Sequence, residues 1–338
     1  MDVSKVQELS YSLVRDQPYL SAFLIVLGSI SVGRLIYQTL SVVLQTFILP
    51  GTNLRKFGAK KGAWAVITGA TDGIGREFSL QLAKAGFHIF LVARNEALLA
   101  STAAEIEQKY GVSTATHSID FSRTDKSAYN SLRSSLGSVD VGVLVNNVGK
   151  SHAMPAYFVD TPEEEISDIV SINVQATLQV THSVLPGMVQ RKRGLILNVG
   201  SFAGAVPSPM LATYSGTKAF LTTFSSALGE EVRKDNISVE HLNTYFVVSK
   251  LSKIRKASAL IPKPDAYVRS VLSKIGLPCG ASYSGRPNTS TPFWSHALLD
   301  YGMTLIGLRS VFISYTHGLH KDIRRRALRK MERDAKLQ

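Results

Sequence analysis

The apolar residues of this chain fall into one long N-terminal block and a later series of short runs. The block covers residues 20–49, where Arg34 is the only charged residue. Because about 20 apolar residues cross the hydrocarbon core of a bilayer, the block predicts one tilted transmembrane helix. A buried core helix is the alternative. Pro50-Gly51 and the basic linker that follows favour the membrane helix, since they separate the block from the rest of the chain.

From residue 63 onward, short apolar runs alternate with amphipathic stretches. The apolar runs predict β-strands over 63–69, 88–94, 141–147, 194–200 and 238–246. The amphipathic stretches predict helices near 74–86, 95–110, 163–190 and 211–234. Several runs lack strict alternation, as expected of strands that are buried on both faces. The β-α alternation therefore predicts an α/β fold with a Rossmann-type doubly wound parallel sheet.

The periodicity weakens after about residue 247. Residues 276–292 are rich in Gly, Ser and Pro, which predicts a loop. Residues 293–315 are hydrophobic and aromatic but include Asp300 and Arg309. We expect an amphipathic helix that lies on the membrane or dips into it, and a second span or a helix packed on the sheet are the alternatives.

These patterns divide the chain into six parts. They are an N-terminal segment (1–18), a transmembrane anchor (19–50), a basic linker (51–62), a Rossmann domain (63–275), a substrate loop with a membrane-associated segment (276–316) and a basic cytosolic tail (317–338).

Charge supports the membrane interpretation. The chain has 38 Lys and Arg against 25 Asp and Glu, a net charge of +13, and basic clusters follow the N-terminal block and fill the tail. Such clusters suit anionic lipid headgroups, whereas no zinc-finger, RRM or basic-zipper pattern indicates nucleic-acid binding. The basic linker places the main domain in the cytosol and the N-terminus in the lumen. A re-entrant hairpin bent near Gly33 would change only the side on which the N-terminus lies.

The single cysteine, Cys279, excludes an intrachain disulfide.

A glycine-rich turn follows the first predicted strand, over residues 68–75 (TGATDGIG). Glycines there allow a tight turn, close backbone approach to a pyrophosphate and close packing of helix on strand. The turn predicts a dinucleotide site that uses Thr68, Gly69, Thr71, Asp72, Gly73, Ile74 and Gly75.

Arginine stands where a cofactor with a free ribose 2′-hydroxyl usually meets an acidic residue. Arg94 ends the second predicted strand, and Arg76 directly follows the third glycine. Two guanidinium groups suit a 2′-phosphate, so the sequence predicts NADPH rather than NADH.

Polar residues that suit carbonyl chemistry follow the later strands. Asn147 and Gly149 end one strand and Ser201 ends another, while Tyr214 and Lys218 stand four apart on one face of a predicted helix. An ammonium near a phenol favours the phenolate, and a serine hydroxyl can hold a carbonyl oxygen against the tyrosine. This pattern predicts acid-catalysed hydride transfer without a metal ion.

Together these motifs resemble the short-chain dehydrogenase/reductase family over about residues 60–260. The resemblance implies that Asp120 contacts adenine, that Asn173 relays protons through water, and that Asn173, Ser201, Tyr214 and Lys218 form the catalytic tetrad. It also implies that Val247 and Ser249 hold the nicotinamide. The preceding Thr244-Tyr245 departs from the Pro-Gly that the family usually has there.

One membrane-bound branch of the family resembles this chain more closely. The similarity lies in the sequences of residues 245–254 and 254–276, in the N-terminal block and in the basic tail. That branch contains the fungal very-long-chain 3-oxoacyl-CoA reductases and 17β-hydroxysteroid dehydrogenase type 12. The resemblance implies NADPH-dependent reduction of long-chain 3-oxoacyl-CoA during fatty-acid elongation at the endoplasmic reticulum membrane. It also implies contact with other elongation enzymes and a homodimer formed through 163–190 and 211–234. The alternatives are a 17-ketosteroid or retinoid reductase and a non-catalytic scaffold. Only Lys336 matches the branch's double-lysine retrieval signal.

Overall fold

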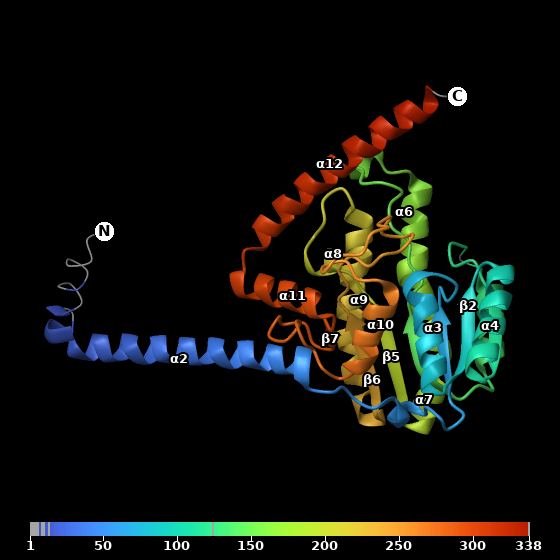
Figure 1. The fold of residues 1–338 in the computed structure, drawn as a ribbon, viewed down its shortest axis with the longest axis horizontal. Helices are drawn as coiled ribbons and strands as arrows, with labels where there is room; N and C mark the ends of the chain where they lie inside the picture. The colour runs from blue at the N-terminus through green and yellow to red at the C-terminus, as the bar shows by residue number, and fades with distance from the viewer. Residues whose placement is uncertain (1–6, 8–10, 13, 124, 337–338) are drawn as a thin grey trace.

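A seven-stranded sheet forms the centre of the computed structural model, which describes all residues except 1–6, 8–10, 13, 124 and 337–338 (Figure 1). Every strand pair is parallel, and the order is β3-β2-β1-β4-β5-β6-β7. The strands are β1 (Trp64–Thr68), β2 (His88–Ala93), β3 (Thr114–Ser118), β4 (Val141–Asn146), β5 (Gly194–Val199), β6 (Ile237–Leu242) and β7 (Thr289–Ser290). This topology confirms the predicted doubly wound fold.

Two apolar clusters cover the two faces of the sheet. Along β1, Ala65 and Ile67 join one cluster while Val66 joins the other, because successive side chains of a strand point to opposite faces. Helices on both faces supply many of the other apolar residues of the clusters. They are α3 (Gly73–Ala85), α4 (Glu96–Tyr110), α5 (Lys126–Leu136), α7 (Ala176–Arg191), α9 (Ala212–Glu231) and α10 (Pro264–Ser273), and two shorter helices, α6 (Glu163–Val170) and α8 (Phe202–Ala205), lie outside the clusters.

The predicted elements differ from the structure in a few places. The pattern missed β3 and α5, and it missed β7 because that strand is two residues long inside the predicted loop. β3 reads TATHS and is only partly buried, so it carries no apolar run. The helix predicted over 163–190 is interrupted by a π-helical turn at Ser171–Gln175, and the strand predicted to reach residue 246 ends at Leu242.

The N-terminal block is a long exposed helix. α2 (Pro18–Val43) continues through a π-helical turn (Leu44–Ile48), and Figure 1 shows it projecting away from the sheet. Within the described residues, Pro18–Ile48 is the one helix long and apolar enough to cross a membrane, with a mean hydropathy of 1.8 and 6% of that window buried. This exposure excludes the core-helix alternative.

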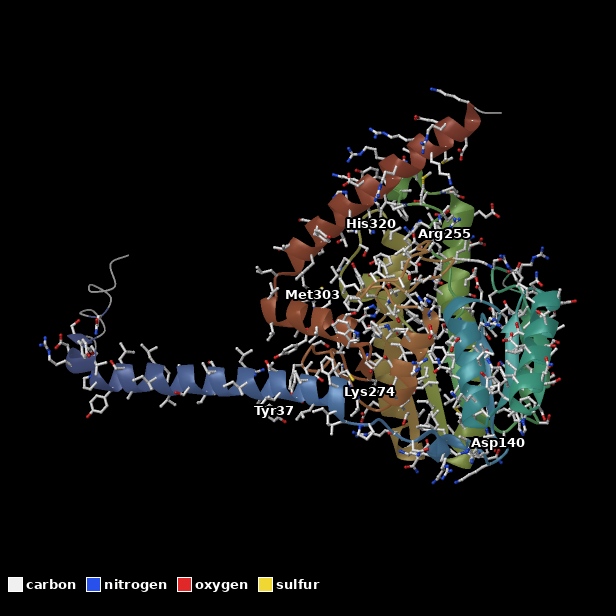
Figure 2. The ribbon with its side chains drawn as sticks, viewed as in Figure 1. Tyr37, Asp140, Arg255, Lys274, Met303 and His320 are labelled. Carbon is white, nitrogen blue, oxygen red and sulfur yellow. The ribbon has the colours of Figure 1, made fainter. Side chains whose placement is uncertain are left out.

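The C-terminal end of α2 is attached to the domain. The Thr39 hydroxyl lies 2.9 Å from the Tyr301 hydroxyl, and the Gln45 side chain accepts a 3.0 Å hydrogen bond from the Cys279 amide. The Tyr37 ring, labelled in Figure 2, meets the Tyr283 ring edge-on. These contacts fix the helix at the side where the C-terminal helices begin.

The single helix expected over 293–315 is two helices. α11 (Trp294–Ile306) ends at Gly307, whose φ of 68° suits a glycine C-cap, and α12 (Arg309–Ala335) follows. α11 packs on the domain through Asp300, which is buried and paired with Arg286. The bend between the helices nevertheless exposes an apolar group: Leu305, Ile306, Leu308, Val311 and Tyr315. The segment therefore combines a packed inner face with an exposed apolar outer face.

Candidate active site

The glycine turn joins β1 to the N-terminus of α3. The Asp72 side chain caps that helix by accepting a 2.9 Å hydrogen bond from the Gly73 amide. A Cβ at Gly75 would lie 2.2 Å from the Gly69 carbonyl oxygen, so no larger residue fits there. Gly69 and Gly73 both have positive φ, at 65° and 52°. The turn is therefore tight, and it brings the N-terminus of α3, where an anion can bind, to the end of β1.

Thr68 and Asn147 connect the turn to the end of β4. The Thr68 hydroxyl accepts hydrogen bonds from the amides of Asn147 and Val148, at 3.0 and 3.1 Å. The Asn147 side chain donates to the Thr68 carbonyl at 3.0 Å. Both residues thus hold the strand ends together, although the sequence alone indicated only cofactor contact.

The two arginines predicted for the 2′-phosphate lie in different surroundings. Arg94 is exposed at the end of β2, whereas the Arg76 guanidinium forms an ion pair with Glu105 on α4. Asp120 accepts hydrogen bonds from the backbone and hydroxyl of Ser122, which hold the pKa of its carboxyl below the usual value. Glu105 could not be predicted as this partner, because it stands 29 positions after Arg76 and no local periodicity connects the two.

Ser201, Tyr214 and Lys218 come together beyond the carboxyl end of β5 and at the amino end of α8. Ser201 caps α8, and its hydroxyl accepts a 3.2 Å hydrogen bond from the Ala203 amide. Tyr214 and Lys218 share one face of α9, with the Lys218 Nζ 5.7 Å from the centroid of the Tyr214 ring. The Lys218 ammonium also donates a 2.8 Å hydrogen bond to the Val199 carbonyl. The structure thus assembles three of the predicted catalytic residues.

Burial controls the proton affinities of this pair. It lowers the pKa of Lys218 to about 8, because the cation loses its hydration. Burial also raises the pKa of Tyr214, and the hydrogen bond with Ser201 opposes this rise only in part. The expected lowering of the Tyr214 pKa by Lys218 is therefore not what this geometry gives. Desolvation outweighs the ammonium, which is directed at Val199.

Asn173 lies in the π-helical turn between α6 and α7 and is fully buried. Its side-chain oxygen accepts from the Lys150 amide at 2.8 Å, and its amide donates to the Lys150 carbonyl and the Thr217 hydroxyl, both at 2.9 Å. A Cβ at Gly149 would lie 3.4 Å from the Asn173 oxygen and 3.7 Å from the Lys218 Nζ. Asn173 thus ties the loop after β4 to the catalytic helix, with one lone pair on its oxygen left over.

The loop after β6 places Val247 and Ser249 beside the glycine turn. Val247 is buried, and the Ser249 hydroxyl accepts from the Ser252 amide at 3.1 Å. The two residues that depart from the family pattern have clear positions. The Thr244 hydroxyl pairs with the buried Tyr267 hydroxyl at 2.5 Å, and the Tyr245 ring packs on Phe202. The loop is therefore held by side-chain contacts in place of the family's Pro-Gly.

A cavity of about 600 Å³ opens in front of these residues. Its walls include Ser201, Tyr214, Lys218, Ile74, Asn147, Gly149, Val247 and Ser249. The opposite wall comes from α11 and α12 and is largely apolar: Leu299, Met303, Val311, Phe312, Tyr315, Leu319 and His320. Figure 2 labels one residue of this wall on each helix, Met303 on α11 and His320 on α12. The sequence motifs missed these residues: the pattern of 293–315 predicted a membrane-associated helix, and Leu319 and His320 lie beyond it.

A parallel doubly wound sheet with a glycine turn and a Ser-Tyr-Lys group defines a nucleotide-dependent oxidoreductase. The family model described as short chain dehydrogenase matches residues 63–259. The chain belongs to the short-chain dehydrogenase family.

Curated relatives and solved structures agree with this assignment. A very-long-chain 3-oxoacyl-CoA reductase of Laccaria bicolor is 95% identical over the full length of both chains. One of Coprinopsis cinerea is 71% identical over 99% of this chain and 98% of its own. Among solved structures, a 7β-hydroxysteroid dehydrogenase has a TM-score of 0.67 at 23% identity, over 78% of this chain and 99% of its own. A Sphingobium yanoikuyae short-chain dehydrogenase in complex with NADPH has a TM-score of 0.60 at 24% identity, over 75% and 95%. These two structural matches show the fold.

Proposed function

We propose that the protein reduces long- and very-long-chain 3-oxoacyl-CoA to 3-hydroxyacyl-CoA with NADPH, as the second step of fatty-acid elongation. The observation that carries this proposal is the apolar cavity in front of Ser201 and Tyr214. Its α11–α12 wall suits the acyl chain beside a reacting carbonyl. The names of the full-length relatives support the same substrate class.

The three catalytic side chains have separate roles in the proposed reaction. NADPH supplies the hydride that goes to C3. The Ser201 hydroxyl holds the C3 carbonyl oxygen, and Tyr214 donates the proton that this oxygen needs. The raised pKa of Tyr214 keeps it protonated at neutral pH, so it is in the form that an acid requires. Lys218 contacts the nicotinamide ribose and keeps a positive charge beside the Tyr214 ring.

We propose that a water molecule bound near Asn173 takes part in returning a proton to Tyr214 after each turnover. Its amide is committed to Lys150 and Thr217, so a relay water can use only the free lone pair of its oxygen. The π-helical turn at Ser171–Gln175 puts this residue within reach of Lys218 through the space beside Gly149. Asn173 therefore positions the loop and the helix beside the relay water, and its side-chain oxygen accepts a hydrogen bond from that water.

The choice of NADPH rests on Arg94 and Arg76. Arg94 is exposed and can meet a 2′-phosphate, and Arg76 can exchange its Glu105 partner for the stronger phosphate contact. No acidic residue stands at the end of β2 to favour a ribose hydroxyl.

Membrane attachment suits this substrate. Each buried CH₂ group contributes roughly 0.8 kcal/mol, so a very long acyl chain stays in an apolar environment. α2 and the exposed apolar bend at 305–308 support an attachment of the domain to the bilayer surface. We place the protein in the endoplasmic reticulum membrane with its catalytic domain in the cytosol, where the basic linker belongs.

A homodimer through α7 and α9 is part of the proposal, together with contact with other elongation enzymes. Leu178, Val189 and Phe220 are each 36% exposed on these helices, and Phe220 stacks on Phe224. Such a surface suits a second copy of the same chain.

The test is NADPH oxidation by membranes that contain the protein, offered a long-chain 3-oxoacyl-CoA or a 17-ketosteroid. We expect turnover of the thioester that disappears in Tyr214→Phe, while NADPH binding by that variant shows that it is folded. Turnover of the steroid alone would overturn the substrate but keep the mechanism. Turnover unchanged in Tyr214→Phe would refute the assigned acid.

A further inference from the structure

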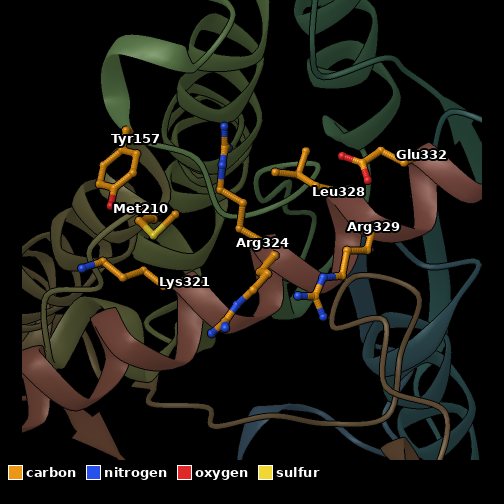
Figure 3. Close-up of a pocket in the computed structure, with 8 residues that line it drawn as sticks. Tyr157, Met210, Lys321, Arg324, Leu328, Arg329 and Glu332 are labelled. Carbon is orange, nitrogen blue, oxygen red and sulfur yellow. The ribbon is translucent and has the colours of Figure 1, made fainter.

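A second cavity, with basic side chains at half of its lining positions, lies beside the catalytic one. It has a volume of about 390 Å³, and α12 forms one side through Lys321, Arg324, Arg325, Leu328, Arg329 and Glu332. Tyr157 and Met210 form the other side, and Figure 3 shows these side chains around the opening. We call this cavity the α12 groove. We propose that the α12 groove binds the phosphates of the CoA half of the substrate, an inference that rests on the proposed function.

The groove and the catalytic cavity share two elements of the chain. His320 lines the catalytic cavity, and the next residue, Lys321, lines the groove. In the same way Leu211 belongs to the cavity and Met210 to the groove. A His320 ring nitrogen lies 2.7 Å from the Pro209 carbonyl oxygen, which fixes α12 to this loop. A molecule that leaves the catalytic cavity along α12 therefore enters the groove.

The spacing fits the arm that connects a thioester to the CoA phosphates. Nine residues separate His320 from Arg329, which is roughly 14 Å along a helix. A pantetheine arm has about twelve bonds from its sulfur to its terminal oxygen, as many as four extended residues, so it extends to roughly 14 Å. A thioester held in the cavity beside His320 can thus place its phosphates among the cations of α12.

Two of the four cations keep their charge free for a ligand. Arg324 is paired with Asp160 and the Pro155 carbonyl, and Arg325 is paired with Asp322. Within the part of the chain that the structure describes, neither Lys321 nor Arg329 has a side-chain hydrogen bond or an ion pair. Glu332 is the single carboxylate of the lining. The groove therefore attracts anions, and a multiply charged phosphate ester is the anion that the substrate provides.

The position of the groove favours this ligand over a lipid headgroup. In Figure 1, α12 rises from the bend toward α6, away from the free end of α2. If α2 crosses the bilayer, the apolar bend faces the membrane and the basic half of α12 leads away from it. The acyl chain and the phosphates would then leave the tetrad in opposite directions, which suits an amphiphilic substrate.

The experiment compares the full-length enzyme in lipid nanodiscs with two charge-matched double variants. Lys321→Gln/Arg329→Gln removes the free cations of the groove. Arg326→Gln/Lys330→Gln removes the same charge from side chains of α12 that do not line the groove. Each enzyme receives one 3-oxoacyl chain as its CoA thioester and as its pantetheine thioester, which has no phosphates.

For the groove variant we expect kcat/KM with the CoA thioester to fall about tenfold, because KM rises while kcat stays the same. With the pantetheine thioester, both kcat and KM should equal those of the wild type. The control variant should match the wild type with both. Added salt should raise the KM of the CoA thioester more in the wild type than in the groove variant.

Three results would decide against the inference or locate the failure elsewhere. Equal behaviour of the two double variants would overturn it. A defect that appears with both thioesters and only in nanodiscs that contain anionic lipid would assign the groove to lipid headgroups and also overturn it. Wild-type enzyme that reduces neither thioester would refute the proposed function itself, which separates that failure from the failure of the groove.

Discussion

At the scale of single residues, burial determines how the site can work. Lys218 and Tyr214 stand four residues apart, so the sequence predicted that they share a helical face. Their proton affinities could not be predicted, because these depend on desolvation and on the Val199 carbonyl that receives the lysine. The ion pair between Arg76 and Glu105 could not be predicted from the sequence either, because a contact between two helices leaves no local pattern.

The lowered pKa of Lys218 predicts a pH limit on cofactor binding. The free enzyme loses the ammonium as the pH rises through about 8, and with it the charge that contacts the ribose. We expect the Kd of NADPH, measured by nucleotide fluorescence, to increase above about pH 8. Lys218→Met should bind more weakly than the wild type below about pH 8, approach it at higher pH, and lack this dependence. Parallel pH curves for the two proteins would contradict the assignment.

The ion pair of Arg76 predicts a change in cofactor preference. Glu105→Gln removes the competing carboxylate, so the affinity for NADPH should rise about two- to fivefold, the range expected for a partly exposed pair. Affinity for NADH should stay constant, as it lacks the 2′-phosphate. Glu96→Gln at the start of the same helix is the control. Equal gains for NADPH and NADH would show that Arg76 does not contact the 2′-phosphate.

At the scale of elements, motifs and apolar periodicity located most of the fold. Five strands, the glycine turn and the catalytic helix were predicted because each combines a local pattern with a burial requirement. β3 and β7 were missed because one is only partly buried and the other has two residues. The break at Gly307 was also missed, since a glycine within an apolar run carries no sign of its backbone angle.

The glycine turn predicts a sharp difference between two Gly→Ala changes. In Gly75→Ala the new methyl would meet the Gly69 carbonyl oxygen at 2.2 Å, so the turn must open and NADPH binding should be lost. Gly216→Ala in α9 meets nothing within 4 Å and should leave binding intact, with a gain of up to about 1 kcal/mol in the free energy of unfolding. Isothermal titration with NADPH distinguishes the two. Normal binding by Gly75→Ala would contradict the tight-turn geometry.

At the scale of the whole molecule, an exposed apolar helix and a basic tail surround a Rossmann domain. The membrane segment was predicted from length and composition alone, which is the physical requirement for crossing a bilayer. The role of α11 and α12 as a wall of the active-site cavity could not be predicted, because it depends on how distant segments pack.

The proposed orientation has a direct test by cysteine labelling. The single native cysteine, Cys279, is buried, and burial raises the pKa of its thiol to about 12, so it should not react. In sealed microsomes, an impermeant maleimide should label Lys330→Cys at once and Gln17→Cys only after detergent is added. Immediate labelling of both would indicate the re-entrant arrangement.

The most direct measurement follows the hydride itself. Membranes with the wild-type protein receive a long-chain 3-oxoacyl-CoA and NADPH carrying deuterium at both C4 positions, and mass spectrometry locates the label in the product. We predict one deuterium at C3 of the 3-hydroxyacyl-CoA, with formation slowed roughly 10²- to 10⁴-fold in Tyr214→Phe. A product without deuterium at C3, or one formed equally fast by Tyr214→Phe, would contradict the account.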